Sequence, residues 1–156
     1  MERLWHELRM DDIISELLGD RQFEFDVHGA VKGMVINRAI NARSKLSTFE
    51  WMDRDMYYPE REELELHHLY RALGFLISHK NTIEGRILSN LTDLFSMDVS
   101  VVFYDCSLVD MHSESSQLVE YFRKGRTQSL VSLVMSRDRL PIAHEVLPGN
   151  TRTSRQ

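Results

Sequence analysis

The chain has 156 residues, of which 42% are hydrophobic and 28% charged, with a formal net charge of −5. This composition is typical of one globular domain or two small ones. The single cysteine, Cys106, excludes an intramolecular disulfide and a zinc site built from cysteines, and it favours a reducing compartment. No apolar run approaches membrane-spanning length and the N-terminus has no signal-peptide core, so we expect a soluble cytoplasmic protein without a membrane partner.

The net charge conceals an asymmetry along the chain. Residues 1–120 hold 22 acidic and 12 basic side chains, whereas residues 121–156 hold 2 acidic and 7 basic ones. The acidic majority argues against a surface that coats nucleic acid as a whole. The basic C-terminal end is either a local phosphate contact or a solvated terminus.

Helical periodicity dominates the first 95 residues. Apolar residues recur at helical spacing from Leu4 to Leu18, which predicts one or two short helices that end at Gly19. Asp26 stands where an N-cap belongs, and in the helix that follows, Gly29 and Gly33 allow a neighbouring helix to approach closely. The remaining expected helices are a buried one over Val27–Ile40, one capped by Ser44 or Ser47 that reaches Met56, one from Glu60 to Ile77, and one over Ile83–Phe95. We therefore predict an all-helical domain over residues 1–95.

At Asp98 the pattern changes from helical to extended. Asp98–Asp105 is a run of β-branched and aromatic residues, which predicts a buried strand with Asp105 at its C-terminal end. A carboxylate in that place either starts a turn or is positioned for chemistry at the edge of a sheet. Ser129–Met135 and Pro141–Leu147 are two more predicted strands, and the short turn between them predicts a hairpin.

Several short motifs occur in an order that resembles a known family. They are Phe103-Tyr104-Asp105-Cys106-Ser107, the turn Tyr121–Arg126, the stretch Leu140–Thr151, and upstream Phe25-Asp26-Val27, Asn37-Arg38, Ser44-Lys45-Leu46 and Leu69–Leu73. In combination, their order and spacing resemble the DDE transposases of bacterial insertion sequences, in the group named after insertion sequence four. The resemblance covers nearly the whole chain.

The resemblance implies an α+β fold, in which the helical domain over residues 1–95 precedes the first three strands of a truncated RNase H-like domain over residues 96–156. It also implies that Asp105 is the first metal-binding carboxylate of a triad that uses Mg²⁺ to cleave and transfer DNA strands. The family's second aspartate and its glutamate lie beyond Gln156. We therefore expect the chain to be inactive by itself and to bind no Mg²⁺ alone.

The resemblance further implies a bacterial cytoplasmic setting. The implied partners are the DNA ends of the element, full-length transposase or a second copy of the chain. Glu145 matches the family's pattern near the site, but an ordinary, partly exposed strand residue is the stronger interpretation. The histidines His67, His68 and His79 are expected to be surface and core residues rather than metal ligands, because adjacent histidines face different sides of a helix.

Six basic residues are candidate DNA contacts. Arg38, Arg43 and Lys45 lie in a polar corner between two predicted helices, and Arg123, Lys124 and Arg126 form a basic turn at the expected rim of the site. Each group is either a phosphate contact or a solvated basic turn.

Two rival hypotheses remain open. The first is that the chain is a non-catalytic helical protein that binds DNA or regulates a transposase. The second is that the polypeptide folds poorly, because a three-stranded sheet without its partner strands exposes an unpaired edge.

Overall fold

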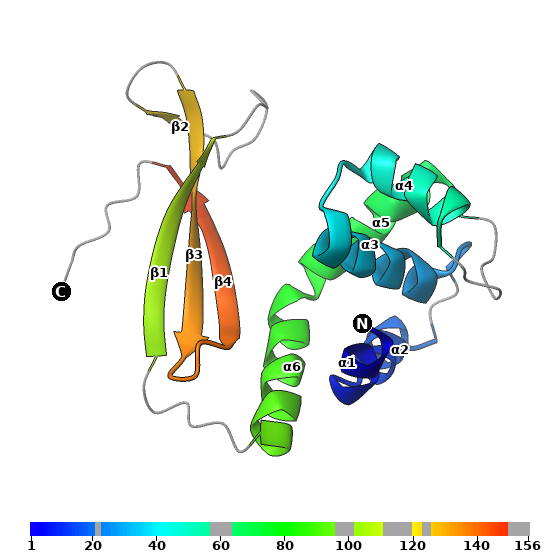
Figure 1. Cartoon of the computed structure of the whole chain (residues 1–156), viewed down its shortest axis with the longest axis horizontal. Helices are drawn as coiled ribbons and strands as arrows, with labels where there is room; N and C mark the ends of the chain where they lie inside the picture. The colour runs from blue at the N-terminus through cyan, green and yellow to red at the C-terminus, as the bar shows by residue number, and fades with distance from the viewer. Residues whose placement is uncertain (21–22, 57–63, 96–101, 111–119, 123–125, 150–156) are drawn as a thin grey trace. The chain divides into compact units, whose positions relative to one another are not determined.

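The computed structural model describes residues 1–20, 23–56, 64–95, 102–110, 120–122 and 126–149. Within these ranges six helices precede four strands (Figure 1), which confirms the predicted α+β class and the order of helices before strands. The chain divides into two compact units, Met1–Asn90 and Leu91–Gln156. The division falls inside the last helix, which itself ends at Phe95.

The N-terminal segment forms two short helices rather than one. Helix α1 spans Glu2–Glu7 and helix α2 spans Met10–Leu18. Arg9 separates them with a left-handed backbone at φ 54°, and Gly19 ends α2 with φ 53°. Glycine is favoured at such a position because it lacks the Cβ that makes positive φ costly, so the predicted stop signal is confirmed.

The next two helices begin at the predicted caps. Helix α3 spans Val27–Asn41, and the side chain of Asp26 accepts a hydrogen bond from the Gly29 amide at 2.9 Å. Helix α4 spans Lys45–Arg54, and Ser44 Oγ accepts from the Ser47 amide at 3.2 Å. Each cap supplies a partner to an amide that has none within the helix.

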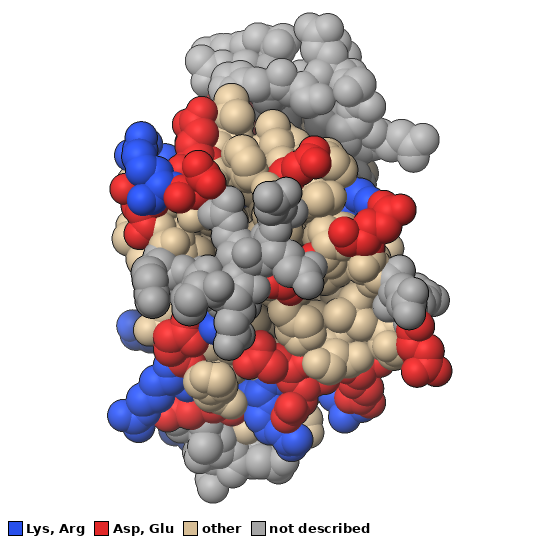
Figure 2. Space-filling model, turned by 90° about the vertical axis from the view of Figure 1, so that its right-hand side faces the viewer, with Lys and Arg blue, Asp and Glu red and all other residues tan. Residues whose placement is uncertain are grey.

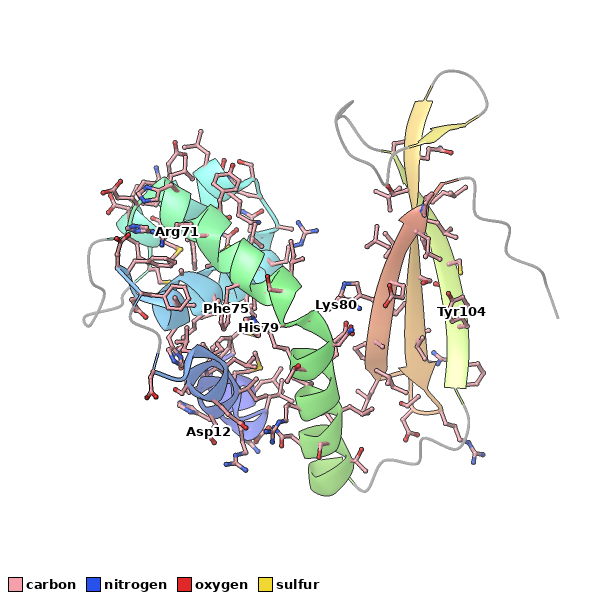
Figure 3. All side chains as sticks on the ribbon, turned by 180° about the vertical axis from the view of Figure 1, so that it is seen from behind. Asp12, Arg71, Phe75, His79, Lys80 and Tyr104 are labelled. Carbon is pink, nitrogen blue, oxygen red and sulfur yellow. The ribbon has the colours of Figure 1, made fainter. Side chains whose placement is uncertain are left out.

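Helices α5 (Leu66–Ser78) and α6 (Lys80–Phe95) complete the helical part. The prediction that Glu60–Glu65 forms the first turn of α5 is wrong at Glu65, which precedes the helix as its N-cap, and residues 60–63 lie outside the described ranges. His79 separates the two helices (Figure 3), with its Nδ1 2.9 Å from the Phe75 carbonyl oxygen. The same carbonyl oxygen accepts from the His79 amide at 3.2 Å, so the backbone and the ring of His79 both contact the last turn of α5.

The core of the helical unit lies between α2, α3 and α5. Ile14, Val31 and Leu69 are fully buried, one from each of these helices. Gly33 lets α4 pack closely on α3, because a Cβ built there would lie 2.2 Å from Cε of the buried Met52. The expectation that a glycine in this helix permits close helix packing is confirmed at Gly33.

Replacing Gly33 with valine is expected to lower the free energy of unfolding by about 1–3 kcal/mol, because the thioether end of the buried Met52 must move aside within the core to admit the new side chain. Gly74→Val is the matched control, since a Cβ at Gly74 meets nothing within 4 Å. Valine forms helix better than glycine, so the control should be neutral or slightly stabilising. Urea unfolding followed by far-UV circular dichroism measures both, and equal losses in the two variants would contradict the packing interpretation.

The strands form one antiparallel sheet with β3 at its centre (Figure 1). The elements are β1 (Val102–Asp110), β2 (Glu120–Phe122), β3 (Arg126–Ser136) and β4 (Pro141–Pro148). β1 lies along one edge of β3, whereas β4 and the short β2 pair with successive parts of its other edge. The predicted β3–β4 hairpin is confirmed.

The hairpin turn follows β3 directly. Arg139 adopts φ 63°, and its amide donates to the Ser136 carbonyl oxygen at 3.0 Å. The fully buried Ser136 also accepts from the Leu140 amide through its Oγ at 3.2 Å. One side chain and one backbone carbonyl of Ser136 therefore fix the turn.

Candidate DNA-contact corner and the surroundings of Asp105

Asp105 lies inside a strand, not at its end. It is the fourth residue of β1, is exposed, and pairs with Leu133 of β3. The predicted strand over Asp98–Asp105 is therefore wrong at its C-terminal boundary, and its first residues, 98–101, lie outside the described ranges. The physical reason is that Leu108 and Val109 continue the strand-forming composition, and a solvent-facing carboxylate does not interrupt a strand.

The prediction that this strand is buried on both faces is also wrong. Phe103, Asp105, Ser107 and Val109 point to one face of β1 and are all exposed, and Tyr104 and Leu108 are exposed on the other face. Figure 3 labels Tyr104 on β1. A strand exposed on both faces holds Asp105 in solvent rather than in a crevice.

The register of the sheet decides which side chains share a face with Asp105. Asp105, Leu133 and His144 stand opposite one another on three adjacent strands. Glu145 pairs with Ser132, the neighbour of Leu133. Because successive residues of a strand point to opposite faces, Asp105 and Glu145 lie on opposite faces of the sheet. Glu145 is exposed, in agreement with its interpretation as a strand residue.

The described residues do not fit a two-magnesium site around Asp105. Among them, no group of three or more His, Cys, Asp or Glu side chains is placed to hold a metal ion. Paired magnesium ions require several carboxylates that converge on one point. Among the described residues, no second carboxylate lies near Asp105 on the same face of the sheet. We therefore derive no cleavage step from this part of the chain.

The corner between α3 and α4 gathers three of the candidate DNA contacts. Arg38 lies in the last turns of α3, Arg43 in the connection, and Lys45 at the first position of α4. Arg38 and Arg43 are exposed and Lys45 is half-buried. No acidic residue occurs from Val27 to Phe49, although the chain as a whole is acidic. We call Arg38, Arg43 and Lys45 the basic corner.

A buried hydrogen-bonded pair beneath the basic corner fixes its shape. Asn37 and Thr48 are each 2% exposed, and Thr48 Oγ1 lies 2.9 Å from both Asn37 Oδ1 and the Ser44 carbonyl oxygen. The single hydroxyl proton is shared between these two acceptors, which ties α3, the connection and α4 together. With its amide oxygen turned toward Arg43, Asn41 accepts from two guanidinium nitrogens at 2.9 Å.

The other predicted DNA contacts are not placed. Arg123 and Lys124 lie outside the described residues, and Arg126 is known only as the first residue of β3. On the face shown in Figure 2, Asp and Glu side chains are scattered among the described residues, and Lys and Arg side chains occur in a few separate groups.

His68 is a buried core histidine and His67 is exposed, as predicted for the pair. The ring of His68 stacks on Phe25 with centroids 4.5 Å apart, and its Nδ1 accepts from the Glu65 amide at 3.0 Å. Burial is the main cause that holds the pKa of His68 below its ordinary value, and the nearby His67 acts in the same direction. The hydrogen bond from the Glu65 amide also favours the neutral form of His68, because Nδ1 can accept a hydrogen bond only in the neutral ring.

The pKa of His68 predicts a loss of stability in acid. Its pKa is lowered in the folded state, so the unfolded chain binds the proton first as the pH falls below about 6.5. The contribution of neutral His68 is thus complete above that pH and lost as the pH falls toward its folded-state pKa. In His68→Gln, the urea midpoint of unfolding should change less between pH 7.5 and 5.5 than in the unaltered chain. This range of about two pH units includes the ordinary pKa of histidine, at which the unfolded chain takes up the proton. His67→Gln is the control, and an equal flattening there would contradict the assignment to His68.

One polar network was not anticipated from the sequence. Ser15 Oγ lies 3.2 Å from His28 Nε2, and His28 Nδ1 lies 3.6 Å from Asp11 Oδ1. Asp11 also accepts from Trp5 Nε1 at 2.8 Å. The four-residue spacing of Asp11 and Ser15 on α2 was the available sequence signal. Ser15 is exposed and Asp11 is engaged by α1, so we interpret the network as a link between α1, α2 and α3.

Comparisons place the chain in no known group. No protein-family model, curated protein or solved structure matches it. Among the described helices, none combines the length and apolarity that crossing a bilayer requires.

Proposed function

We propose that the chain is the N-terminal part of an insertion-sequence transposase, with a helical DNA-binding unit and the opening strands of an RNase H-like domain. One observation carries the proposal: a helical unit precedes an antiparallel sheet in which β1, β3 and β4 are consecutive long strands and β1 bears Asp105. In this interpretation they are the three strands that the sequence motifs imply, and β2 is a short addition to β3.

The basic corner supports a DNA-binding role for the helical unit. Among the described residues, none of its three side chains forms an ion pair, and the buried Asn37–Thr48 pair holds the backbone that carries them. Guanidinium and ammonium groups in such a setting can replace the counterions of a DNA backbone. In this proposal the corner binds phosphates and any selectivity for sequence comes from neighbouring contacts.

Asp105 is proposed as the position of a metal ligand in the complete enzyme. Within the described residues it has no partner carboxylates on its side of the sheet at the required distance. In the proposed family enzyme the two remaining acids come from further strands and helices. The chain as given is therefore expected to bind DNA and not to cleave it.

Selective binding of element ends tests the proposal. The 156-residue chain is titrated against labelled duplexes copied from inverted repeats that flank its gene, and against shuffled duplexes of equal length and composition. The proposal predicts tighter binding of the repeats by at least about 10³-fold if recognition is of the specific class. Equal affinity for both duplexes at physiological salt would contradict it.

A regulatory role is the second candidate. Two observations favour it. The structure describes all three residues of the basic corner, whereas among the described residues no acids join Asp105 in a metal site. A chain that occupies element ends without cutting would compete with an active transposase. Inhibition of end cleavage by the added chain, lost when the basic corner is altered, would distinguish this role from that of an inert fragment.

A further inference from the structure

The helical unit contains an apolar pocket of about 220 Å³ between α1, α3 and α6. Glu2 and Lys32 are the charged residues of its lining, and all of the lining lies within the compact unit Met1–Asn90. A concave apolar site with few polar groups is the usual form of a small-molecule site. The apolar residues that the three helices and the C-cap of α1 supply to the lining are Leu4, Trp5, Leu8, Val35, Ile36 and Ile87.

The pocket lining includes both exposed apolar side chains and a buried ring. Leu4 is 45% exposed and Val35 is 37% exposed, whereas Trp5 is 5% exposed. The indole nitrogen of Trp5 donates a hydrogen bond to Asp11 Oδ1 at 2.8 Å, which fixes the orientation of the ring. The ring is therefore a preformed wall of the pocket, and a preformed wall lowers the ordering cost of binding.

Lys32 brings a positive charge to this apolar pocket. Its side chain is 13% exposed, and its Nζ lies 2.8 Å from a carboxylate oxygen of Glu2 and 6.0 Å from the centre of the Trp5 ring. The side chain of Glu2 is 61% exposed. A nearly buried ammonium group requires an anionic or polar partner, whereas an exposed carboxylate loses little when it turns into water. Another carboxylate can therefore take the place of Glu2 on Lys32.

We propose that the pocket binds a small monocarboxylate with an apolar body. The carboxylate of the ligand replaces that of Glu2 on Lys32, and the apolar body lies against Trp5. The proposal depends on the helical unit alone, and not on the DNA-binding role.

The volume of the pocket sets the size of the ligand. A cavity of about 150 Å³ holds one benzene molecule, so this pocket suits a body of roughly the size of an indole ring or of an eight-carbon chain. A docked amphipathic helix inserts several anchor side chains along a groove of two or more turns, which a pocket of this volume does not accommodate.

Fluorescence of Trp5 with two matched probes tests the proposal. In a Trp51→Phe chain, Trp5 is the single tryptophan, and octanoate should change its emission in a saturable manner. Lys32→Met should weaken octanoate binding by at least about tenfold, because a hydrogen bond to a charged group is lost, but should change the binding of octan-1-ol by no more than about twofold. Glu2→Gln should strengthen octanoate binding, because a neutral amide competes less for Lys32.

A variant that fills the pocket tests where the probe binds. Val35→Phe should abolish the response to both probes. Ile40→Phe is the matched control on α3, because Ile40 is 65% exposed and does not line the pocket, and it should leave octanoate binding unchanged. Far-UV circular dichroism confirms that each variant is folded.

Three outcomes would overturn the proposal. The first is the absence of a saturable response to octanoate up to about 10 mM, a concentration that would reveal even weak binding. The second is an octanoate affinity that stays the same in Lys32→Met, which would leave an apolar pocket without a carboxylate site. The third is an equal effect of Val35→Phe and Ile40→Phe on octanoate binding, which would place the probe elsewhere on the chain.

Discussion

Replacing Leu69 with alanine is expected to lower the free energy of unfolding of the helical unit by about 2–5 kcal/mol. Leu69 lies on α5, is fully buried, and belongs to the apolar cluster that α2, α3 and α5 enclose. The substitution removes buried methyl groups and leaves a cavity that the surrounding helices fill only in part. Since domains are typically stable by about 5–15 kcal/mol, this loss is a large fraction of the total.

The neighbour Tyr70 is the matched control for Leu69. It is 56% exposed, so Tyr70→Ala should change the free energy of unfolding by no more than about 0.5 kcal/mol. Urea unfolding at constant pH, followed by the helical signal in far-UV circular dichroism, measures both variants. A Leu69→Ala loss as small as that of Tyr70→Ala would mean that α5 does not pack in the core described above.

Removing the basic corner is expected to weaken DNA binding and to reduce its salt dependence. In the triple variant Arg38→Ala, Arg43→Ala, Lys45→Ala, each lost phosphate contact should lower the slope of log affinity against log salt by about 0.9, so by about 2.7 in total. The effect should be the same for specific and shuffled duplexes, because phosphates carry no base sequence. Fluorescence anisotropy over a range of salt concentrations gives the slope.

Arg54→Ala controls for the loss of positive charge alone. Arg54 is an exposed residue at the other end of α4, and its guanidinium lies 3.3 Å from the Asp55 carboxylate. A side chain whose charge is already paired should contribute little to counterion release. If the triple variant keeps the slope of the unaltered chain, or if Arg54→Ala loses as much per residue, the corner is not the contact surface.

The helical half of the fold was largely predictable from the sequence. Asp26 was predicted as a cap and Ser44 as one of two candidates with Ser47, and both Asp26 and Ser44 accept amide hydrogen bonds. Caps and stops act within one turn of the chain, so their signals are local. The start of α5 was predicted too early, because a helix could begin anywhere in the acidic stretch before it. The hydrogen bond from the Glu65 amide to His68 Nδ1 fixes the start, and sequence periodicity does not show that bond.

The sheet was harder to predict than the helices. The β3–β4 hairpin followed from two short apolar runs and a tight turn, but the boundary of β1 did not, because the strand continues through Asp105 and Ser107 to Asp110. What sustains it is the pairing with β3, a partner distant in sequence. The same register separates Asp105 from Glu145, and no spacing along the chain could have shown on which face each would lie.

The central proposal is that Asp105 is one acid of a cleavage site that this chain does not form by itself. Its most direct test is a nicking assay on supercoiled plasmid that carries the flanking inverted repeats, with magnesium present, using the unaltered chain and Asp105→Ala. We predict that both chains bind the plasmid equally and that neither nicks it. Magnesium-dependent nicking by the unaltered chain that is lost in Asp105→Ala would contradict the proposal.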